Sequence, residues 1–204
     1  GFLGAGSVSY LYYANRLYQL PLALFGIGIS TVLLPAAARA VNAENYEKLL
    51  DNYYDSLKFM LYFLIPISVI TFYFSETFVR LVYMRSDKSF NLKTAIALQC
   101  YIAGLIFYAA NIITTQLYYS KKDTKTPVYF ISINMLLNFI FCIAIVKIWQ
   151  NRDTRFAGLA LANSISGLIY FIMLTTNIRK KIKQINIKPI IIYALKIFLI
   201  AIIA

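Results

Sequence analysis

The sequence lacks histidine altogether and contains only two cysteines and eight acidic residues in 204 positions. Histidine is the side chain that most often binds metals and transfers protons at neutral pH, so a histidine-dependent catalytic centre is excluded. Cys100 and Cys142 both lie in apolar stretches and form neither a disulfide framework nor a CxxC metal site. Charged residues make up 14% of the chain, against about 25% in soluble domains, which excludes a large soluble catalytic domain.

The sequence is instead rich in long apolar stretches. It is 60% hydrophobic with a mean hydropathy of +0.67. The hydrocarbon core of a bilayer requires about 20 apolar residues per helix. Five stretches without a charged residue are long enough to span it: 17–38, 59–75, 94–120, 126–146 and 156–178.

Two further segments have the same character. Segment 190–204 is interrupted only by Lys196, and segment 1–13 has the composition of the second half of a span. We therefore predict an all-α integral membrane protein, a polytopic bundle of about seven transmembrane helices that forms one domain over 1–204. The chain opens with Gly1 and ends within an apolar segment, so we expect the first and last helices to be incomplete.

The basic residues predict how the loops are distributed across the membrane. Twenty Lys and Arg residues against eight acidic ones give a net charge of +12. In a soluble protein this charge would indicate nucleic acid, but here most basic residues lie in short segments between apolar stretches, so no nucleic-acid partner is expected. Loops 39–58, 121–125 and 179–188 fall on one side and hold the larger share. The positive-inside tendency makes that side cytoplasmic, where the cluster at 179–183 also attracts anionic membrane lipids.

The segment 42–58 is polar but repeats apolar residues at helical spacing. Those residues are Tyr46, Leu49, Leu50, Tyr53 and Leu57. The pattern predicts an amphipathic helix that lies in the membrane interface. Asp51 and Asp55 share one face of it, but two carboxylates without histidine or a third acid are a solvated helix face rather than a metal site.

Two prolines fall inside apolar stretches, namely Pro35 and Pro66. Proline removes a backbone hydrogen bond in a helix interior, so both helices are expected to bend or break there unless neighbouring groups replace that bond.

Arg16 is the most informative polar residue. It lies between two apolar segments with no acidic residue near it in the sequence. A guanidinium at membrane depth must find water, an anion or carbonyl oxygens, and its planar fork matches a phosphate or carboxylate. Ser9 lies two helical turns earlier, so Ser9, Tyr12 or Tyr13, and Arg16 are predicted to form one polar stripe. The alternative is that Arg16 caps a helix end at the headgroup level.

A second polar pair, Asn134 and Asn138, lies in the stretch 126–146. Their spacing of four residues places both carboxamides on one helix face. Such groups either bind a hard cation or form hydrogen bonds to a neighbouring helix. The sequence alone leaves both interpretations open.

Two blocks of sequence resemble a known family. Residues 6–21 and 25–35, with Arg39 four residues further on, are similar to the seventh and eighth helices of the MurJ/MviN lipid II flippases of the MOP exporter superfamily. Residues 118–127 resemble the link between that family's tenth and eleventh helices. The two blocks occur in the family's order, and the resemblance covers essentially the whole chain as the C-terminal lobe of a two-lobe transporter.

The resemblance implies a fold, a function and a site. Two helical lobes would surround a cavity, and the protein would move undecaprenyl-diphosphate-linked lipid II from the inner to the outer leaflet of the bacterial inner membrane by alternating access. The first lobe, absent here, would be a required partner. Arg16 matches an arginine of the family's cationic cavity, proposed to hold the substrate's pyrophosphate, and Ser9 matches a cavity serine.

This sequence departs from the family pattern at two positions. The residue before the arginine is often Asp in the family and is Asn15 here. Asn134 and Asn138 fall near where some members of the family place a sodium site on the eleventh helix, with an Asp at the second position, so Asn138 lacks that charge. The resemblance therefore implies one cofactor, a sodium ion, and the uncharged side chain of Asn138 puts that ion in doubt.

Other functions remain open at this point. A related exporter of lipid-linked oligosaccharides or drugs would share the fold and differ in the chemistry of its cavity. A non-transporting scaffold subunit is also compatible with these residues. An enzyme that acts on polyprenyl phosphates would need an acidic cluster or a histidine, and the long apolar stretches contain neither. We therefore expect a transporter rather than an enzyme.

Overall fold

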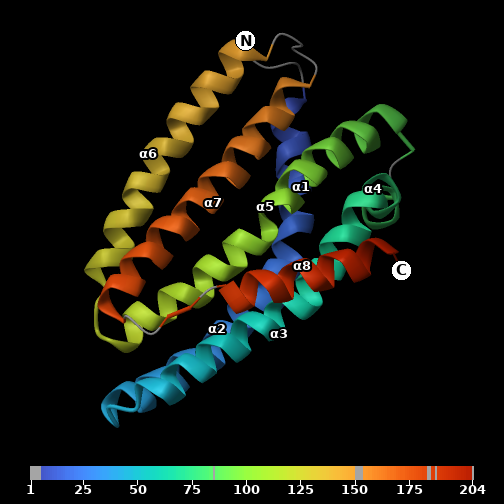
Figure 1. Cartoon of the computed structure of the whole chain (residues 1–204). Helices are drawn as coiled ribbons and strands as arrows, with labels where there is room; N and C mark the ends of the chain where they lie inside the picture. Colours follow the sequence, from blue (N-terminus) through green and yellow to red (C-terminus); the bar gives the residue numbers. More distant parts are fainter. Residues whose placement is uncertain (1–5, 85, 150–153, 183–184, 187, 204) are drawn as a thin grey trace.

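The computed structural model describes residues 6–84, 86–149, 154–182, 185–186 and 188–203. These residues form helices joined by turns, and none of them forms a strand. The helices are shown in Figure 1 and follow in chain order: α1 (Ser7–Pro21), η1 (Leu22–Ile27), α2 (Gly28–Asn42), α3 (Tyr46–Tyr73), α4 (Ser75–Tyr83), α5 (Lys88–Ser120), α6 (Lys125–Ile148), α7 (Arg155–Lys181) and α8 (Lys188–Ile203).

Five helical stretches among the described residues are long and apolar enough to cross a membrane. They are Ser7–Asn42, Tyr46–Tyr73, Lys88–Ser120, Lys125–Ile148 and Arg155–Lys181. The shorter α8 coincides with the sixth apolar segment of the sequence. The predicted all-α polytopic bundle is confirmed.

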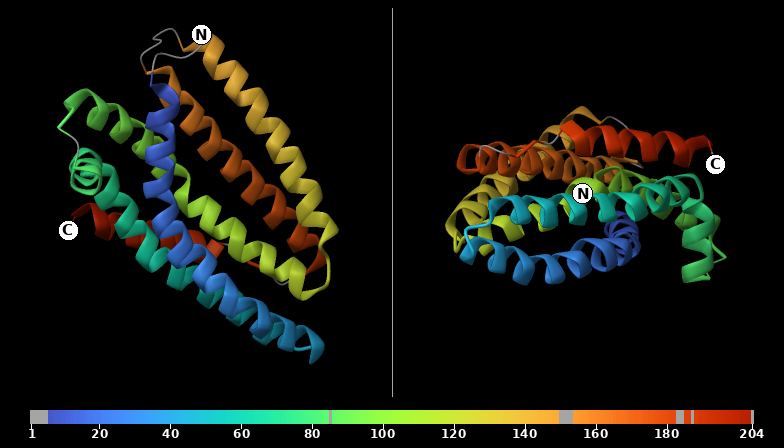
Figure 2. Two further views of the ribbon diagram at one scale, coloured as in Figure 1. Left: turned by 180° about the vertical axis from the view of Figure 1, so that it is seen from behind. Right: turned by 60° about the horizontal axis from the view of Figure 1, so that its bottom comes forward.

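The first two spans predicted from the sequence are one continuous helical stretch. Helices α1, η1 and α2 follow one another without a gap from Ser7 to Asn42, so Arg16 lies inside a helix and not at a joint between two. A helix satisfies its own backbone hydrogen bonds, so one cationic side chain does not end it. The stretch bends where α1 meets η1 (Figure 2). Pro21 ends α1 there, and the wider π turn that follows accommodates its missing N–H.

The segment 42–58, predicted as an interfacial amphipathic helix, is not a separate helix. Asn42 ends α2, and the Asn45 side chain then accepts a 2.9 Å hydrogen bond from the backbone N–H of Lys48 to start α3. Helix α3 continues unbroken to Tyr73. The apolar residues of the segment face other helices, because Leu49, Leu50, Tyr53 and Leu57 are buried in the core. An amphipathic pattern does not distinguish a face covered by lipid from a face covered by protein.

The prolines inside helices do not break them. Pro35 lies within α2 and Pro66 within α3, and both helices continue past the proline. The break expected at these two positions is therefore absent, and the bend of the N-terminal stretch follows Pro21 instead.

Helix α5 is the centre of the bundle and packs against α1, α2, α3, α4 and α7. Its approach to α7 is close because small residues meet there. A Cβ added at Gly104 would lie 2.5 Å from the Ser164 Oγ, and that hydroxyl donates a 2.6 Å hydrogen bond to the Cys100 carbonyl. Close approach of backbones at small residues is the usual way helices associate in lipid. Helix α6 lies at the periphery, beside α7 (Figure 1).

Helix α4 was not predicted. Its nine residues lie in a region that the charge pattern assigned to a loop. Its polar residues Glu76, Thr77 and Arg80 lie on one side, and its apolar residues lie on the other, where Val79 is buried and Phe78, Leu81 and Val82 are exposed, so the helix is amphipathic. It packs against α5 and α3 near one end of the bundle.

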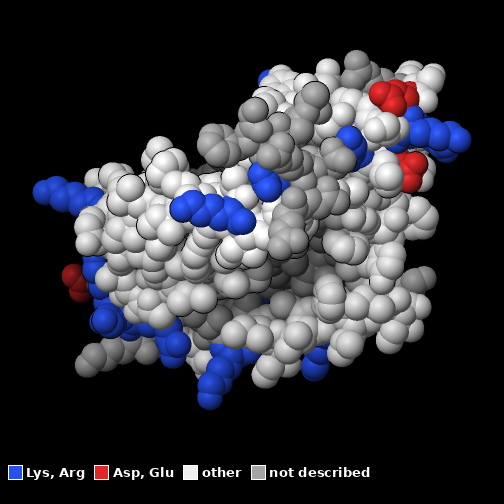
Figure 3. All heavy atoms as spheres, turned by 90° about the horizontal axis from the view of Figure 1, so that it is seen from above, with Lys and Arg blue, Asp and Glu red and all other residues white. Residues whose placement is uncertain are grey.

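The three loops of the predicted basic side do gather at one end. The Lys121 ammonium lies 5.3 Å from the centre of the Tyr46 ring, which links the α5–α6 turn to the start of α3. Lys181 forms an ion pair with Asp123 across the same end. The Asn186 backbone N–H donates a 2.7 Å hydrogen bond to the Tyr54 hydroxyl. Seen from above, the surface is mostly uncharged, with Lys and Arg both near its edges and over its upper middle part, and a few Asp and Glu at its sides (Figure 3).

Candidate functional site

Arg16 is exposed on α1, opposite the face that packs on the bundle. Ala14, Leu17 and Tyr18 of the same helix are buried, and α1 packs chiefly against α5. Seen from behind, α1 lies in front of α5 and α7 (Figure 2). The core-facing residues therefore turn the Arg16 side chain outward.

The guanidinium of Arg16 has one side-chain partner among the described residues. Its Nε and Nη2 donate hydrogen bonds of 3.2 and 2.9 Å to the Tyr12 hydroxyl, and its Cζ lies 5.1 Å from the centre of the Tyr12 ring. No carboxylate in the described part of the chain forms an ion pair with it. Guanidinium has five N–H donors, so most of them remain for an anion.

The predicted stripe is formed by Tyr12 rather than Tyr13. Ser9 is exposed two turns before Arg16, and Tyr12 is 53% exposed between them. Tyr13 is half-buried, and its ring packs at 4.7 Å from Tyr83 and 5.3 Å from Phe90, measured between centroids. The structure thus places Ser9, Tyr12 and Arg16 on one exposed face. Spacing alone does not distinguish the two tyrosines, because residues three and four positions apart both lie on one helix face. The packing of Tyr13 against Tyr83 and Phe90 does.

The Asn138 side chain forms a hydrogen bond to a neighbouring helix. Its Nδ2 donates to the Ser166 Oγ at 2.9 Å, which joins α6 to α7. Its Oδ1 accepts a contact of 3.6 Å from the Cys142 Sγ. The interpretation of this residue as a link between helices is confirmed.

Asn134 has a different environment. It is 8% exposed, and its Oδ1 is buried without a hydrogen-bond partner among the described residues. Asn111 on α5 is 3% exposed, and its Oδ1 is also buried without a hydrogen-bond partner among the described residues. Both side chains line one cavity of about 320 Å³ between α5, α6 and α7, and Thr115 and Gln116 contribute polar groups to it.

Two buried acceptors at one cavity are energetically costly unless a donor or a cation occupies it. In the sequence Asn111 is one of several polar residues of the stretch 94–120, and its place at this cavity could not be predicted, because contacts between helices depend on packing that the sequence does not show. The described residues contain no group of three or more His, Cys, Asp or Glu side chains that could hold a metal ion. A cation in this cavity would therefore be bound by uncharged oxygens.

The chain is similar to proteins of one known family. The family model for lipid II flippase MurJ matches residues 1–204. A probable lipid II flippase MurJ from Helicobacter pylori is 33% identical over 174 residues, which are 84% of this chain and 37% of the relative. A probable lipid II flippase MurJ from Borreliella burgdorferi is 33% identical over 196 residues, which are 95% of this chain and 38% of the relative.

A solved structure agrees with the sequence comparisons. The lipid II flippase MurJ in its inward closed conformation superimposes with a TM-score of 0.79 at 32% identity, covering 97% of this chain and 40% of that one. The chain thus spans about two fifths of the length of the relatives that it matches. It belongs to the lipid II flippase MurJ family and is a multi-pass protein of the bacterial inner membrane.

Proposed function

We propose that this chain forms one lobe of a lipid II flippase and that Arg16 binds the diphosphate of the transported lipid. Because the chain spans only 37% to 40% of its relatives, transport would require the remainder of a full-length protein as the facing wall of the transport cavity. Lipid II and that remainder are the proposed partners, and no covalent bond of the substrate is changed.

The observation that carries this proposal is an exposed guanidinium inside an apolar helical stretch, in the third turn from its start. Arg16 lies within the 36-residue stretch Ser7–Asn42, and among the described residues only a neutral hydroxyl contacts it. A cation at membrane depth without a carboxylate is expensive unless water or an anion reaches it. A diphosphate would supply the missing charge, and the Ser9 and Tyr12 hydroxyls on the same face would supply further hydrogen bonds.

A cationic surface of this kind lowers the cost of moving a diphosphate lipid across the membrane. Charged groups do not cross hydrocarbon unaided, because burial of an unpaired charge is expensive. Exposure of Arg16 first to one side and then to the other, by relative movement of two lobes, would carry the headgroup across.

Complementation tests this proposal. In the full-length protein, Arg16→Ala should fail to support growth of cells depleted of their own flippase while the protein remains in the membrane. Arg16→Lys should be impaired because the bidentate fork is lost. Arg80→Ala is the matched control, since Arg80 is exposed on α4 outside the candidate spans. Full growth with Arg16→Ala would contradict the role of Arg16.

We also propose that a sodium ion occupies the cavity between α5, α6 and α7. The buried and unpartnered oxygens of Asn134 and Asn111 would be its ligands. Asn138 would hold α6 against α7, since its carboxamide already contacts Ser166 and Cys142. Uncharged oxygens suit a weakly bound alkali cation better than a divalent one.

The test compares thermal unfolding of the full-length protein in sodium, potassium and choline chloride at equal ionic strength. Sodium should raise the midpoint of the wild-type protein, and Asn134→Leu should abolish that increase. Asn138→Ala should lower the midpoint in all three salts and keep the sodium-dependent difference. Equal midpoints of the wild-type protein in all three salts would contradict a sodium site.

A further inference from the structure

Helix α4 connects two membrane-spanning helices at the end of the bundle opposite the basic loops. Helix α3 starts beside the basic α5–α6 turn and ends at Tyr73, and α5 starts at Lys88 and returns. The uncharged stretch 59–75 runs through α3 to Ser75, the first residue of α4. No polar spacer therefore separates α4 from the membrane, and the helix begins where the span leaves the hydrocarbon core.

Helix α4 runs across the direction of the spans. Figure 1 views α4 along its axis, whereas α3 and α5 lie across the view. The right-hand view of Figure 2 shows α4 from the side, again crossing the direction of α3. A short helix that crosses the spans at their end lies along the membrane surface and not through the membrane.

One side of α4 borders α1 and is polar. The Tyr83 hydroxyl donates a 2.8 Å hydrogen bond to the Tyr13 carbonyl of α1. Arg80 and Glu76 precede Tyr83 by three and seven residues, so they lie on the same side of the helix, and both are exposed. This side, with Glu76, Arg80 and Tyr83, is the polar flank of α4. Next to it Val79 is buried, and α4 packs chiefly against α5.

The opposite side of α4 is apolar and open. This apolar flank consists of Phe78, Leu81 and Val82, which are 41%, 65% and 50% exposed. Leu81 and Tyr83 are two residues apart, which is about 200° around a helix, so the apolar flank turns away from α1. Exposed apolar side chains are unfavourable in water and are stabilised when lipid covers them.

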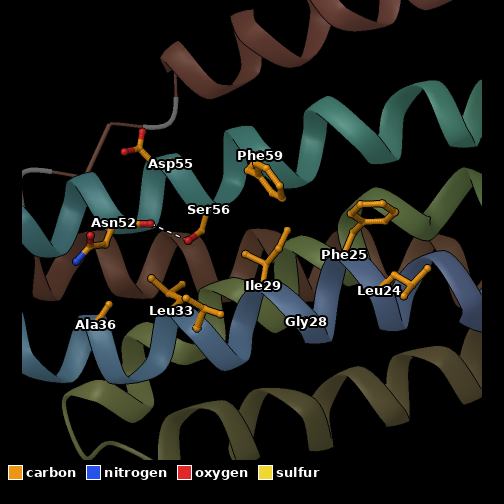
Figure 4. Close-up of a pocket in the computed structure, with 11 residues that line it drawn as sticks. Leu24, Phe25, Gly28, Ile29, Leu33, Ala36, Asn52, Asp55, Ser56 and Phe59 are labelled. Atoms are coloured by element: carbon orange, nitrogen blue, oxygen red, sulfur yellow. Dashed lines mark hydrogen bonds between the residues drawn. The ribbon is translucent and has the colours of Figure 1, made fainter.

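The apolar flank is separate from the groove between α2 and α3. That groove has a volume of about 580 Å³, and its lining comes from α3 and from the N-terminal stretch, as Phe59 and Leu24 show (Figure 4). Leu20 and Leu24 follow Arg16 in steps of four residues and are exposed, so the groove continues the Arg16 face. That face belongs to the proposed transport cavity, whereas the apolar flank of α4 turns away from α1.

Exposed aromatic residues mark the membrane level beside α4. Phe72, Tyr73 and Phe74 follow one another at the end of α3, and each is exposed. Phe72 and Tyr73 share a pocket with Phe198 of α8, which lies on the other side of the bundle from α1 (Figure 2). Tyrosine is enriched at the level where the hydrocarbon core of a membrane meets the headgroups. The apolar flank thus continues an aromatic surface at the edge of the hydrocarbon.

We propose that α4 anchors the bundle in the membrane surface at this end, with its apolar flank among the lipid acyl chains and its polar flank in water, and that this anchor holds α1 through Tyr83. The partner is the bilayer surface, and the proposal does not depend on the proposed transport function. One acid and one base cancel on α4, so apolar burial and not lipid charge supplies the attachment. Amphipathic helices of this kind bury their apolar face about 5 to 10 Å into the interface.

Spin labels on the two flanks test the position of α4. The full-length protein, with its native cysteines replaced by alanine, carries the label at Val82→Cys or at Arg80→Cys in phosphatidylcholine nanodiscs. The two positions face nearly opposite directions, because two residues are about 200° apart on a helix. Oxygen, which concentrates in hydrocarbon, should relax the label at Val82→Cys more than a water-soluble nickel chelate does. The order should reverse at Arg80→Cys, the matched control.

Either of the other results at Val82→Cys would overturn the proposal. Stronger relaxation by the nickel chelate would show that the apolar flank lies in water. Weak relaxation by both reagents would show that another part of the protein covers the apolar flank.

The charge of the lipid separates apolar burial from electrostatic attraction. The result at Val82→Cys should be the same in phosphatidylglycerol nanodiscs and at high salt concentration, because the two charges of α4 cancel. Contact with lipid that appears only in phosphatidylglycerol, or that high salt removes, would show an electrostatic attachment and overturn the proposal.

The link to α1 is tested by hydrogen exchange of the α1 segment around Tyr13. In the double variant Phe78→Gln with Val82→Gln, the exchange rate should rise by about tenfold, since two half-exposed apolar side chains together gain at least about one tenfold step when lipid covers them. Glu76→Gln with Arg80→Gln is the matched control, because it changes two exposed residues of α4 and keeps its net charge at zero. This control should exchange as the wild-type protein does. Equal exchange in the two double variants would show that the apolar flank does not hold α1 and would overturn the proposal.

Discussion

The hydroxyl of Tyr83 donates a 2.8 Å hydrogen bond to the backbone carbonyl of Tyr13. The two rings also meet edge to face with centroids 4.7 Å apart. Tyr83 ends the short helix α4, and Tyr13 lies three residues before Arg16 on α1. A helix that the sequence did not predict therefore fixes the segment of α1 that carries the candidate anion-binding arginine.

Removal of that hydroxyl should weaken the protein measurably. Tyr83→Phe keeps the ring contact and loses the hydrogen bond, so the free energy of unfolding should fall by about 1 kcal/mol. Denaturation in mixed detergent micelles measures this change. Tyr73→Phe is the control, because that side chain is 70% exposed and should change the free energy little. Equal values for both variants would show that the contact with Tyr13 contributes nothing.

The same glycine-to-alanine change should have opposite effects at two positions. At Gly104 an added Cβ would lie 2.5 Å from the Ser164 Oγ and 2.7 Å from its Cα, so α5 and α7 must separate, which costs about 1 to 3 kcal/mol. At Gly28 the added Cβ would meet only the Ala23 carbonyl oxygen at 3.7 Å, an ordinary van der Waals contact, and the helix should gain about 0.5 to 1 kcal/mol. Unfolding free energies of the two variants check the prediction, which fails if Gly104→Ala is as stable as Gly28→Ala.

The ion pair between Lys181 and Asp123 should make the stability of the protein depend on pH. A hydrogen bond from Lys181 lowers the pKa of Asp123 from 3.8 to about 2, and hydrogen bonds from Thr126 act in the same direction. The Asp123 carboxyl therefore binds a proton more tightly in the unfolded chain than in the folded protein. The ion pair stabilises the fold above about pH 4, and this stabilisation is lost as the pH falls toward 2.

This dependence should disappear in Asp123→Asn, which keeps an oxygen to accept the Thr126 N–H. Unfolding midpoints measured across that range should differ between the wild-type protein and the variant above pH 4 and converge toward pH 2. Asp55→Asn is the control, because Asp55 pairs with Lys58 in an exposed position and should leave the profile unchanged. A wild-type profile that Asp123→Asn reproduces in full would contradict the assignment.

The spans were predictable because insertion into lipid depends on local composition. The stretches 126–146 and 156–178 became Lys125–Ile148 and Arg155–Lys181, within a few residues at each end. The errors occurred where local pattern is ambiguous. Segment 42–58 has the same periodicity whether its apolar face meets lipid or α5, and the Tyr53 hydroxyl in fact meets Thr114 of α5 at 3.0 Å.

The candidate site was predictable only in part. Arg16 was identified because a lone cation between apolar residues is rare, and Tyr12 shares its face because helical spacing is regular. The pairing of Asn134 with Asn111 in one cavity joins α6 to α5, and the sequence does not show which faces of those helices meet. The role of Tyr83 was missed for the same reason, since 70 residues separate it from Tyr13.

The central claim is that Arg16 binds the diphosphate of lipid II. The most direct test is the affinity of the purified full-length protein for lipid II, measured for the wild-type protein, Arg16→Lys and Arg16→Ala at equal salt concentration. Loss of a charged hydrogen-bonding partner should weaken binding about tenfold or more in Arg16→Ala, with Arg16→Lys between the two. An affinity of Arg16→Ala equal to that of the wild-type protein would contradict the claim.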